Sequence, residues 1–135
     1  MGAVAPLTFG PFPAGAFVAS VVDVAETASI DQITMLRIGE SANIELFKYT
    51  APDGQRHDMP KNSDWSGHHI AFYVTDIDAA VEYMVEKGVR KMPAGPFTLT
   101  DGPAAGQTIQ YFQTPWGGYI EFISYPDGMA YEVPS

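Results

Sequence analysis

Residues 67–81 read Gly-His-His-Ile-Ala-Phe-Tyr-Val-Thr-Asp-Ile-Asp-Ala-Ala-Val, and this stretch decides the fold class. Its first half is apolar and rich in aromatic and β-branched residues, which predicts a strand from His68 to Val74. From the second half onward, apolar side chains follow a helical spacing that predicts one buried helix face: Ile77, Ala80, Val81 and Met84. Thr75 is the expected N-cap of this helix, and Gly88 its expected end.

Three more strands are predicted after the helix. A loose strand spans Gly95 to Thr100, a second spans Thr108 to Gln113, and a third spans Tyr119 to Tyr125, with a Pro-Trp-Gly-Gly turn at 115–118 joining the last two. Strand, helix and three strands form a βαβββ unit of the α+β class. We expect a curved mixed sheet with the helix on its convex face.

The first half of the chain predicts a shorter version of this unit. Strands at 30–38 and 42–49, joined by Gly39-Glu40-Ser41, are typical of a hairpin. Leu7–Phe9 could form a short strand, and residues 16–25 could form one or two helical turns.

An internal repeat connects the two halves. Asn-Ile-Glu-Leu-Phe-Lys-Tyr at 43–49 is followed by Pro-Asp-Gly, as is Tyr-Ile-Glu-Phe-Ile-Ser-Tyr at 119–125. The glutamates Glu45 and Glu121 lie 76 positions apart (121 − 45). The repeat indicates either two similar hairpins or two copies of one module. The predicted organisation is a shortened N-terminal module (1–54), a connector (55–66), a complete module (67–128) and a tail (129–135).

Three polar side chains form the candidate site. Glu45 and Glu121 each lie within an apolar strand, where an unpaired carboxylate is costly, and His69 opens the first strand of the complete module. One His and two Glu on three strands, with no thiolate, suit Zn, Ni, Co, Mn or Fe. The alternative is that the glutamates face solvent, that His69 is an ordinary strand-end residue, and that no metal binds.

Residues 67–81 and 111–121 resemble the opening and the closing hairpin of a module in the vicinal oxygen chelate superfamily. This superfamily includes glyoxalase I, extradiol dioxygenases, methylmalonyl-CoA epimerases and the bleomycin-resistance binding proteins. The resemblance covers residues 30–128. It implies paired βαβββ modules that curl into a half-barrel, with Glu45, His69 and Glu121 as metal ligands.

The repeat also shows a departure from the family pattern. A counterpart of His69 in the first module would fall at position −7 (69 − 76), so the first strand and helix of that module are missing or are replaced by residues 1–25. A complete metal site would then need water, His68 or a residue from a second chain.

The resemblance implies three candidate functions. The first is a glyoxalase I-like, metal-dependent lyase or isomerase acting on a small substrate with vicinal oxygens, with Glu121 as the base. The second is a non-catalytic binding protein, in which aromatic residues such as Tyr73, Tyr111 and Trp116 stack on a flat drug or metabolite. The third is an extradiol-type dioxygenase, which needs two His ligands. His68 and His69 are adjacent and are therefore expected on opposite strand faces.

Composition narrows the choice of partners. The chain has 135 residues, 46% of them apolar, which is enough for one domain with a real core. Seven basic against 16 acidic residues give a net charge of −9, which argues against nucleic acid and anionic membranes. The absence of cysteine is compatible with a reducing cytoplasm. Because a shortened module leaves a strand edge bare, we expect a homodimer.

Overall fold

The computed structural model describes residues 6–40 and 42–128. The predicted tail at 129–135 and Ser41 of the predicted hairpin turn lie outside the described residues. The chain divides into two compact units, unit 1 at residues 1–56 and unit 2 at residues 57–135. Within the described part, neither helix is long and apolar enough to cross a membrane.

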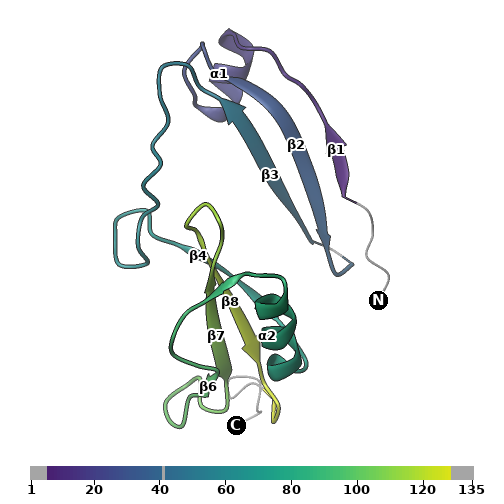
Figure 1. The fold of residues 1–135 in the computed structure, drawn as a ribbon, viewed down its shortest axis with the longest axis vertical. Helices are drawn as coiled ribbons and strands as arrows, with labels where there is room; N and C mark the ends of the chain where they lie inside the picture. The colour runs from purple at the N-terminus through teal and green to yellow at the C-terminus, as the bar shows by residue number, and fades with distance from the viewer. Residues whose placement is uncertain (1–5, 41, 129–135) are drawn as a thin grey trace. The chain divides into compact units, whose positions relative to one another are not determined.

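Unit 1 is a three-stranded antiparallel sheet with one short helix (Figure 1). Its elements are β1 (Leu7–Phe9), α1 (Ala16–Val22), β2 (Ser29–Ile38) and β3 (Ala42–Thr50), and the sheet order is β1-β2-β3. This confirms the predicted hairpin and the short N-terminal strand. Val18 of α1 packs on Ile30 and Ile33 of β2, and Phe47 of β3 joins this core.

Unit 2 contains the predicted strand, helix and strands. Its elements are β4 (His69–Tyr73), α2 (Ile77–Glu86), β5 (Arg90–Lys91), β6 (Phe97–Thr98), β7 (Thr108–Gln113) and β8 (Tyr119–Ser124). The sheet order is β4-β8-β7-β5, and β6 also pairs with β7. Strand β4 runs parallel to β8, so the sheet is mixed, and the α+β fold class is confirmed.

Two details of unit 2 differ from the prediction. The N-cap of α2 is Asp76, not Thr75, because the Asp76 side chain accepts a 3.0 Å hydrogen bond from the Ala79 backbone N–H. A carboxylate at this position also faces the positive end of the helix dipole. The loose strand predicted at 95–100 shrinks to two residues, and the two-residue strand β5 was not predicted.

The repeat holds at the level of strand register. All 6 residue pairs between β7 and β8 have counterparts 76 positions earlier between β2 and β3. For example, Tyr111 pairs with Glu121 as Met35 pairs with Glu45. A turn with the same hydrogen bond follows each hairpin, from the Gly54 N–H to the Ala51 carbonyl and from the Gly128 N–H to the Tyr125 carbonyl, but these turns are 74 positions apart (128 − 54), two fewer than the strands. The two hairpins are therefore structural copies.

The helices cover opposite faces of these copies. Helix α2 packs on Phe112 and Phe122, and we call this side of the unit 2 sheet the outer face and the opposite side, with Tyr111 and Glu121, the inner face. Helix α1 instead packs on Ile33 and Phe47. Their repeat counterparts, Ile109 and Ile123, lie on the inner face of unit 2. Thus α1 is not the counterpart of α2.

Candidate functional site

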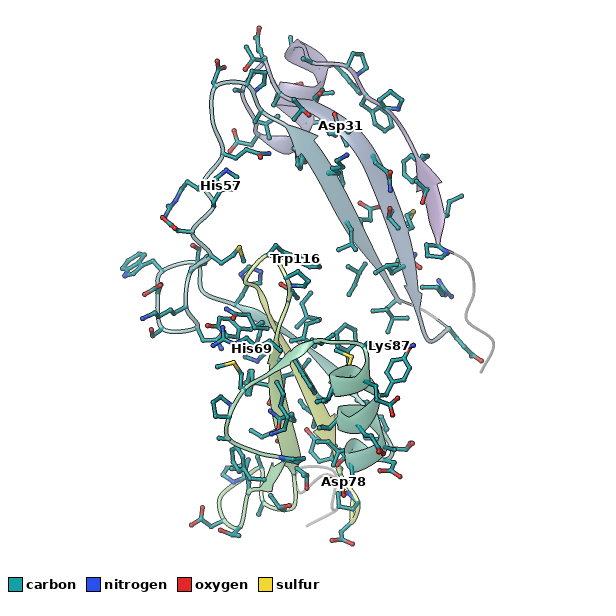
Figure 2. All side chains as sticks on the ribbon, viewed as in Figure 1. Asp31, His57, His69, Asp78, Lys87 and Trp116 are labelled. Atoms are coloured by element: carbon teal, nitrogen blue, oxygen red, sulfur yellow. The ribbon has the colours of Figure 1, made fainter. Side chains whose placement is uncertain are left out.

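Strand pairing in unit 2 brings three polar side chains together on the inner face. Glu121 is opposite Ala71 of β4 on one side and opposite Tyr111 of β7 on the other. His69 lies two residues before Ala71, at the start of β4 (Figure 2), so it shares this face. The result is a cluster of His69, Tyr111 and Glu121, contributed by three neighbouring strands.

Glu121 is the buried member of the cluster. Its side chain is charged, yet it is only 6% exposed and its neighbours along β8 are apolar. Its Oε2 atom lies 3.0 Å from Nε2 of His69, close enough for the ring N–H to donate to the carboxylate. A buried carboxylate is stable when hydrogen bonds replace its water. Two of the three predicted ligands, His69 and Glu121, thus lie side by side on the inner face, and the predicted face shared with Glu45 stays a prediction.

Tyr111 completes the enclosure of the carboxylate. Its hydroxyl lies 3.3 Å from Nε2 of His69, and the two rings meet edge to face with centroids 5.1 Å apart. Burial, followed by the charge of Glu121 and a hydrogen bond with its carboxylate, raises the pKa of Tyr111 to about 12. The phenol therefore keeps its proton at neutral pH and acts as a donor.

One side of the cluster borders solvent-exposed residues of β4. His69, Ala71 and Tyr73 form an exposed stripe along the inner face of β4. Ala71 is the neighbour of Glu121 in register and has only a methyl group as its side chain. A buried carboxylate beside an exposed stripe can accept a proton from a molecule that lies on the stripe.

The other aromatic residues predicted to bind substrate do not join the cluster. Tyr73 is 61% exposed and stacks on Tyr125, with ring centroids 6.2 Å apart. Trp116 is also mostly exposed and lies in the turn between β7 and β8 (Figure 2). His68 is turned away by the strand alternation, and its Nδ1 lies 3.0 Å from the Ser66 carbonyl oxygen. Only Tyr111, of the aromatic residues predicted to bind substrate, contacts a predicted ligand.

Glu45 lies on β3 in unit 1, whereas His69 and Glu121 lie in unit 2. It is exposed and lines a cavity of about 290 Å³ between α1 and the sheet. The other lining residues are all apolar: Phe12, Phe17, Val18, Val21, Val22, Ile30, Ile33 and Phe47. A carboxylate at the wall of an apolar cavity favours a ligand that is both apolar and cationic.

The donor atoms in unit 2 fit part of a metal site. The imidazole nitrogen of His69 and the carboxylate of Glu121 already converge, and N/O pairs of this kind suit Zn, Ni, Co, Mn or Fe. Among residues 6–40 and 42–128, no group of three His, Cys, Asp or Glu side chains is close enough to hold a metal ion. The predicted three-ligand site with Glu45 stays a prediction.

A family model places this arrangement in a known superfamily. The model of the glyoxalase/bleomycin resistance protein/dioxygenase superfamily matches residues 14–110, more than half of the chain. The chain belongs to this superfamily. The glyoxalase superfamily resemblance expected from residues 67–81 and 111–121 is thereby confirmed.

Two relatives of this glyoxalase superfamily chain are informative. A 2-epi-5-epi-valiolone epimerase from an Actinomyces species is 49% identical over 120 residues, which cover 88% of this chain and 64% of the relative. The chain thus spans slightly less than two thirds of the length of this curated relative. The crystal structure of a glyoxalase family protein from Bacillus cereus superposes with a TM-score of 0.66 at 16% identity, covering 88% of this chain and 77% of that one, which supports the fold.

From the sequence, Tyr111 is predicted only as an aromatic residue that stacks on a substrate. Its contact with Glu121 follows from the hairpin register, because a turn centred on residue 116 places residue 111 opposite residue 121. The predicted strands at 108–113 and 119–125, with the turn between them, already contain the information that residues 111 and 121 pair. The raised pKa of Tyr111 depends on burial by the folded sheet and has no signal in the sequence.

Proposed function

We propose that the chain is an epimerase that moves a proton at a carbon beside a carbonyl group, in a small substrate with neighbouring oxygens. The observation that carries this proposal is the buried carboxylate of Glu121, hydrogen-bonded by His69 and Tyr111 and bordered by an exposed stripe. The epimerase that is 49% identical over 120 residues supports the reaction class. Its named substrate, 2-epi-5-epi-valiolone, is the first compound to test.

Glu121 is the proposed base. Its carboxylate takes the proton from the carbon, and the electron pair of the broken C–H bond forms the double bond of an enolate while the carbonyl oxygen becomes negative. A solvent water then gives a proton to the opposite side of this planar carbon, which forms the epimer, and the hydroxide that remains takes the proton from Glu121 so that the carboxylate is restored. Burial favours the transfer because a carboxylate shielded from bulk water is a more effective base toward carbon.

Tyr111 and His69 are the proposed donors. The Tyr111 hydroxyl keeps its proton, since its pKa is raised to about 12, and once Glu121 has taken the substrate proton this hydroxyl can turn from the carboxyl group and donate its hydrogen bond to the enolate oxygen. His69 holds the carboxylate through its Nε2 atom at 3.0 Å and fixes the direction of the second oxygen. Both groups stabilise charge without moving far during the reaction.

A divalent ion would be held in unit 2 by His69 and Glu121. When bound, such an ion supplies a Lewis acid that polarises adjacent substrate oxygens. The glyoxalase I-like version of the function, in which Glu45 is a further ligand, remains a proposal.

The test is exchange of substrate hydrogen with solvent. Purified protein, alone and with each of Zn, Ni, Co, Mn and Fe added, is incubated with 2-epi-5-epi-valiolone in D₂O and followed by proton NMR. We expect deuterium at one carbon and a second diastereomer. Glu121→Gln should lose both signals, whereas Glu82→Gln, an exposed change on α2, should keep them. Equal exchange by Glu121→Gln and the unchanged protein would refute the role of Glu121.

A non-catalytic binding function is the second candidate. The apolar cavity of unit 1, with Glu45 in its wall, is the observation that favours it. A titration with an aromatic amine by calorimetry tests it. Binding that Glu45→Gln weakens, in a protein that shows no exchange in D₂O, would favour this function over the epimerase.

A further inference from the structure

The inner face of the unit 2 sheet carries a polar row of side chains beside Glu121. Strand pairing sets His69, Tyr119 and Gln113 in one line across β4, β8 and β7, and Arg90 of β5 pairs with Gln113 at the end of that line. Residues paired across strands point to the same face of a sheet. Glu121 lies in the next row, two residues after Tyr119 on β8.

The row on the other side of Glu121 is mostly apolar. It consists of Tyr73, Ile123, Ile109 and Phe97, paired in line across β4, β8, β7 and β6. A molecule that lies over Glu121 therefore gains most by directing its polar groups toward the row that ends in Arg90.

Arg90 is exposed and is held by a neutral group. Its Nη1 atom donates a hydrogen bond to Oε1 of Gln113, and Nε2 of Gln113 donates to the Gly117 carbonyl oxygen at 3.1 Å. Among residues 6–40 and 42–128, no carboxylate pairs with Arg90, so the amide orients the guanidinium without neutralising it. The Nε–H and Nη2–H donors, a parallel pair that matches an oxyanion, stay available.

Unit 1 places a guanidinium in the same row of its own hairpin. Arg37 of β2 is the repeat counterpart of Gln113, and it pairs in register with Asn43 of β3. Its Nη1 atom donates to Oδ1 of Asn43 at 3.2 Å. Both hairpins thus have an arginine oriented by an amide one row from the glutamate, although the residues that supply the pair differ. This recurrence favours a role for the group at this row.

We propose that Arg90 determines substrate specificity by binding an acidic group, a carboxylate or a phosphate ester, at the end of the substrate remote from the carbon that Glu121 deprotonates. This inference rests on the proposed epimerase function and deepens it. The Cα atoms of Arg90 and Glu121 are about 12 Å apart on strand geometry, because β5 is two strands from β8 and the two rows are two residues apart. The two side chains take up part of this distance, and a small substrate spans the rest.

Charge favours an acidic group over a hydroxyl group at Arg90. Hydrogen bonds between two charged groups are roughly twice as strong as those between neutral groups. The other cation on the described strands of unit 2, Lys91, pairs with Phe112 and therefore lies on the outer face, where its Nζ donates to the Gly95 carbonyl oxygen at 2.8 Å. In a chain with a net charge of −9, Arg90 is thus the strand cation that faces the cluster in the described part of unit 2.

The first experiment compares three hydroxyketones by their kcat/KM for deuterium exchange with solvent. Dihydroxyacetone is neutral, dihydroxyacetone phosphate carries a phosphate ester, and hydroxypyruvate carries a carboxylate. We expect one acidic compound to exceed the neutral one by about tenfold or more, and its identity tells phosphate from carboxylate. Arg90→Gln should remove this preference mainly by raising KM. Arg90→Lys should restore part of it, because an ammonium group keeps the charge but not the parallel donors.

Lys87→Gln is the matched control, because it removes the same charge from the C-terminal end of α2, which packs on the outer face. It should leave the preference in place. An equal loss in Lys87→Gln, a preference that Arg90→Gln leaves intact, or no preference for either acidic compound would overturn the proposal. Arg90 would then only be a charge that protects the edge strand β5.

A binding measurement separates this inference from the proposed function. Inorganic phosphate and acetate are titrated into the protein, and the side-chain amide of Gln113, which contacts Arg90, is followed by NMR. A saturating shift that Arg90→Gln abolishes and Lys87→Gln keeps supports the acidic-group site even if no compound exchanges deuterium, in which case the epimerase proposal fails alone. Equal exchange of all three compounds with no shift of Gln113 would overturn this inference and leave the epimerase proposal standing.

Discussion

The hairpins β2–β3 and β7–β8 share one register and differ in what surrounds them. In unit 2, β4 and α2 enclose the hairpin, and Glu121 is 6% exposed beside His69. In unit 1, the counterpart Glu45 is exposed on a sheet whose helix lies on the inner side. The same residue at the same register position therefore has a different environment. The comparison teaches that the neighbouring strand β4, which brings His69 beside Glu121, rather than the hairpin itself, gives the glutamate its buried and hydrogen-bonded position.

The largest expected effect separates the two glutamates. Glu121→Gln keeps the size of the side chain but removes the base, so we expect proton exchange with substrate to fall by roughly 10²- to 10⁴-fold. The fold should survive, because the amide can still accept a hydrogen bond from His69. The measurement is the rate of deuterium incorporation by NMR, with circular dichroism as the check on folding. A loss of the same size in Glu45→Gln would show that both copies contribute to the reaction.

The second prediction compares Phe112 with its counterpart Leu36. Phe112 is fully buried under α2, so Phe112→Ala should lower the free energy of unfolding by about 3–5 kcal/mol. Leu36 is only half-buried, so Leu36→Ala should cost about 1 kcal/mol or less. Urea unfolding followed by tryptophan fluorescence and circular dichroism measures both. Similar losses would mean that the outer face of unit 1 is covered in solution.

The third prediction concerns the cap of α2, a helix with no counterpart at the matching face among residues 6–40 and 42–56. Asp76→Ala removes the acceptor of the Ala79 N–H and should cost about 1 kcal/mol of stability. Thr75→Ala is the matched control and should change stability by less than about 0.5 kcal/mol. If Thr75→Ala were the more damaging change, the cap would be the one expected from the sequence alone.

The sequence predicted most of the fold and part of the site. Strand β7 was placed at Thr108–Gln113, as observed, because alternation and flanking turns are local signals. The choice between Thr75 and Asp76 as the cap depends on backbone angles that neither residue type determines. The two-residue strand β5 has no pattern of its own and forms only because β7 provides an edge. His69 and Glu121 lie 3.0 Å apart because strand register brings them together, whereas the place of Glu45 depends on how the two units assemble.

The last comparison concerns the titration of Tyr111, whose counterpart in unit 1 is Met35. Burial and the nearby carboxylate raise its pKa from 10.0 to about 12, so the phenol should ionise well above pH 10.0. Ultraviolet absorbance titration should show this late step, and Tyr111→Phe should remove it. Glu121→Gln should move the step to lower pH but not back to 10.0, because burial is the larger cause.

The raised pKa of Tyr111 also sets the direction of a stability change. Unfolded tyrosine loses its proton near pH 10.0, whereas folded Tyr111 holds it to about pH 12. Between these values the folded state binds more protons than the unfolded state, so stability is complete below pH 10.0 and falls as pH rises toward 12. Tyr111→Phe should flatten this part of the profile, measured as the urea midpoint against pH. An equally steep fall in Tyr111→Phe would assign the loss to other groups, and the hydrogen bond between Tyr111 and Glu121 would then lack support in solution.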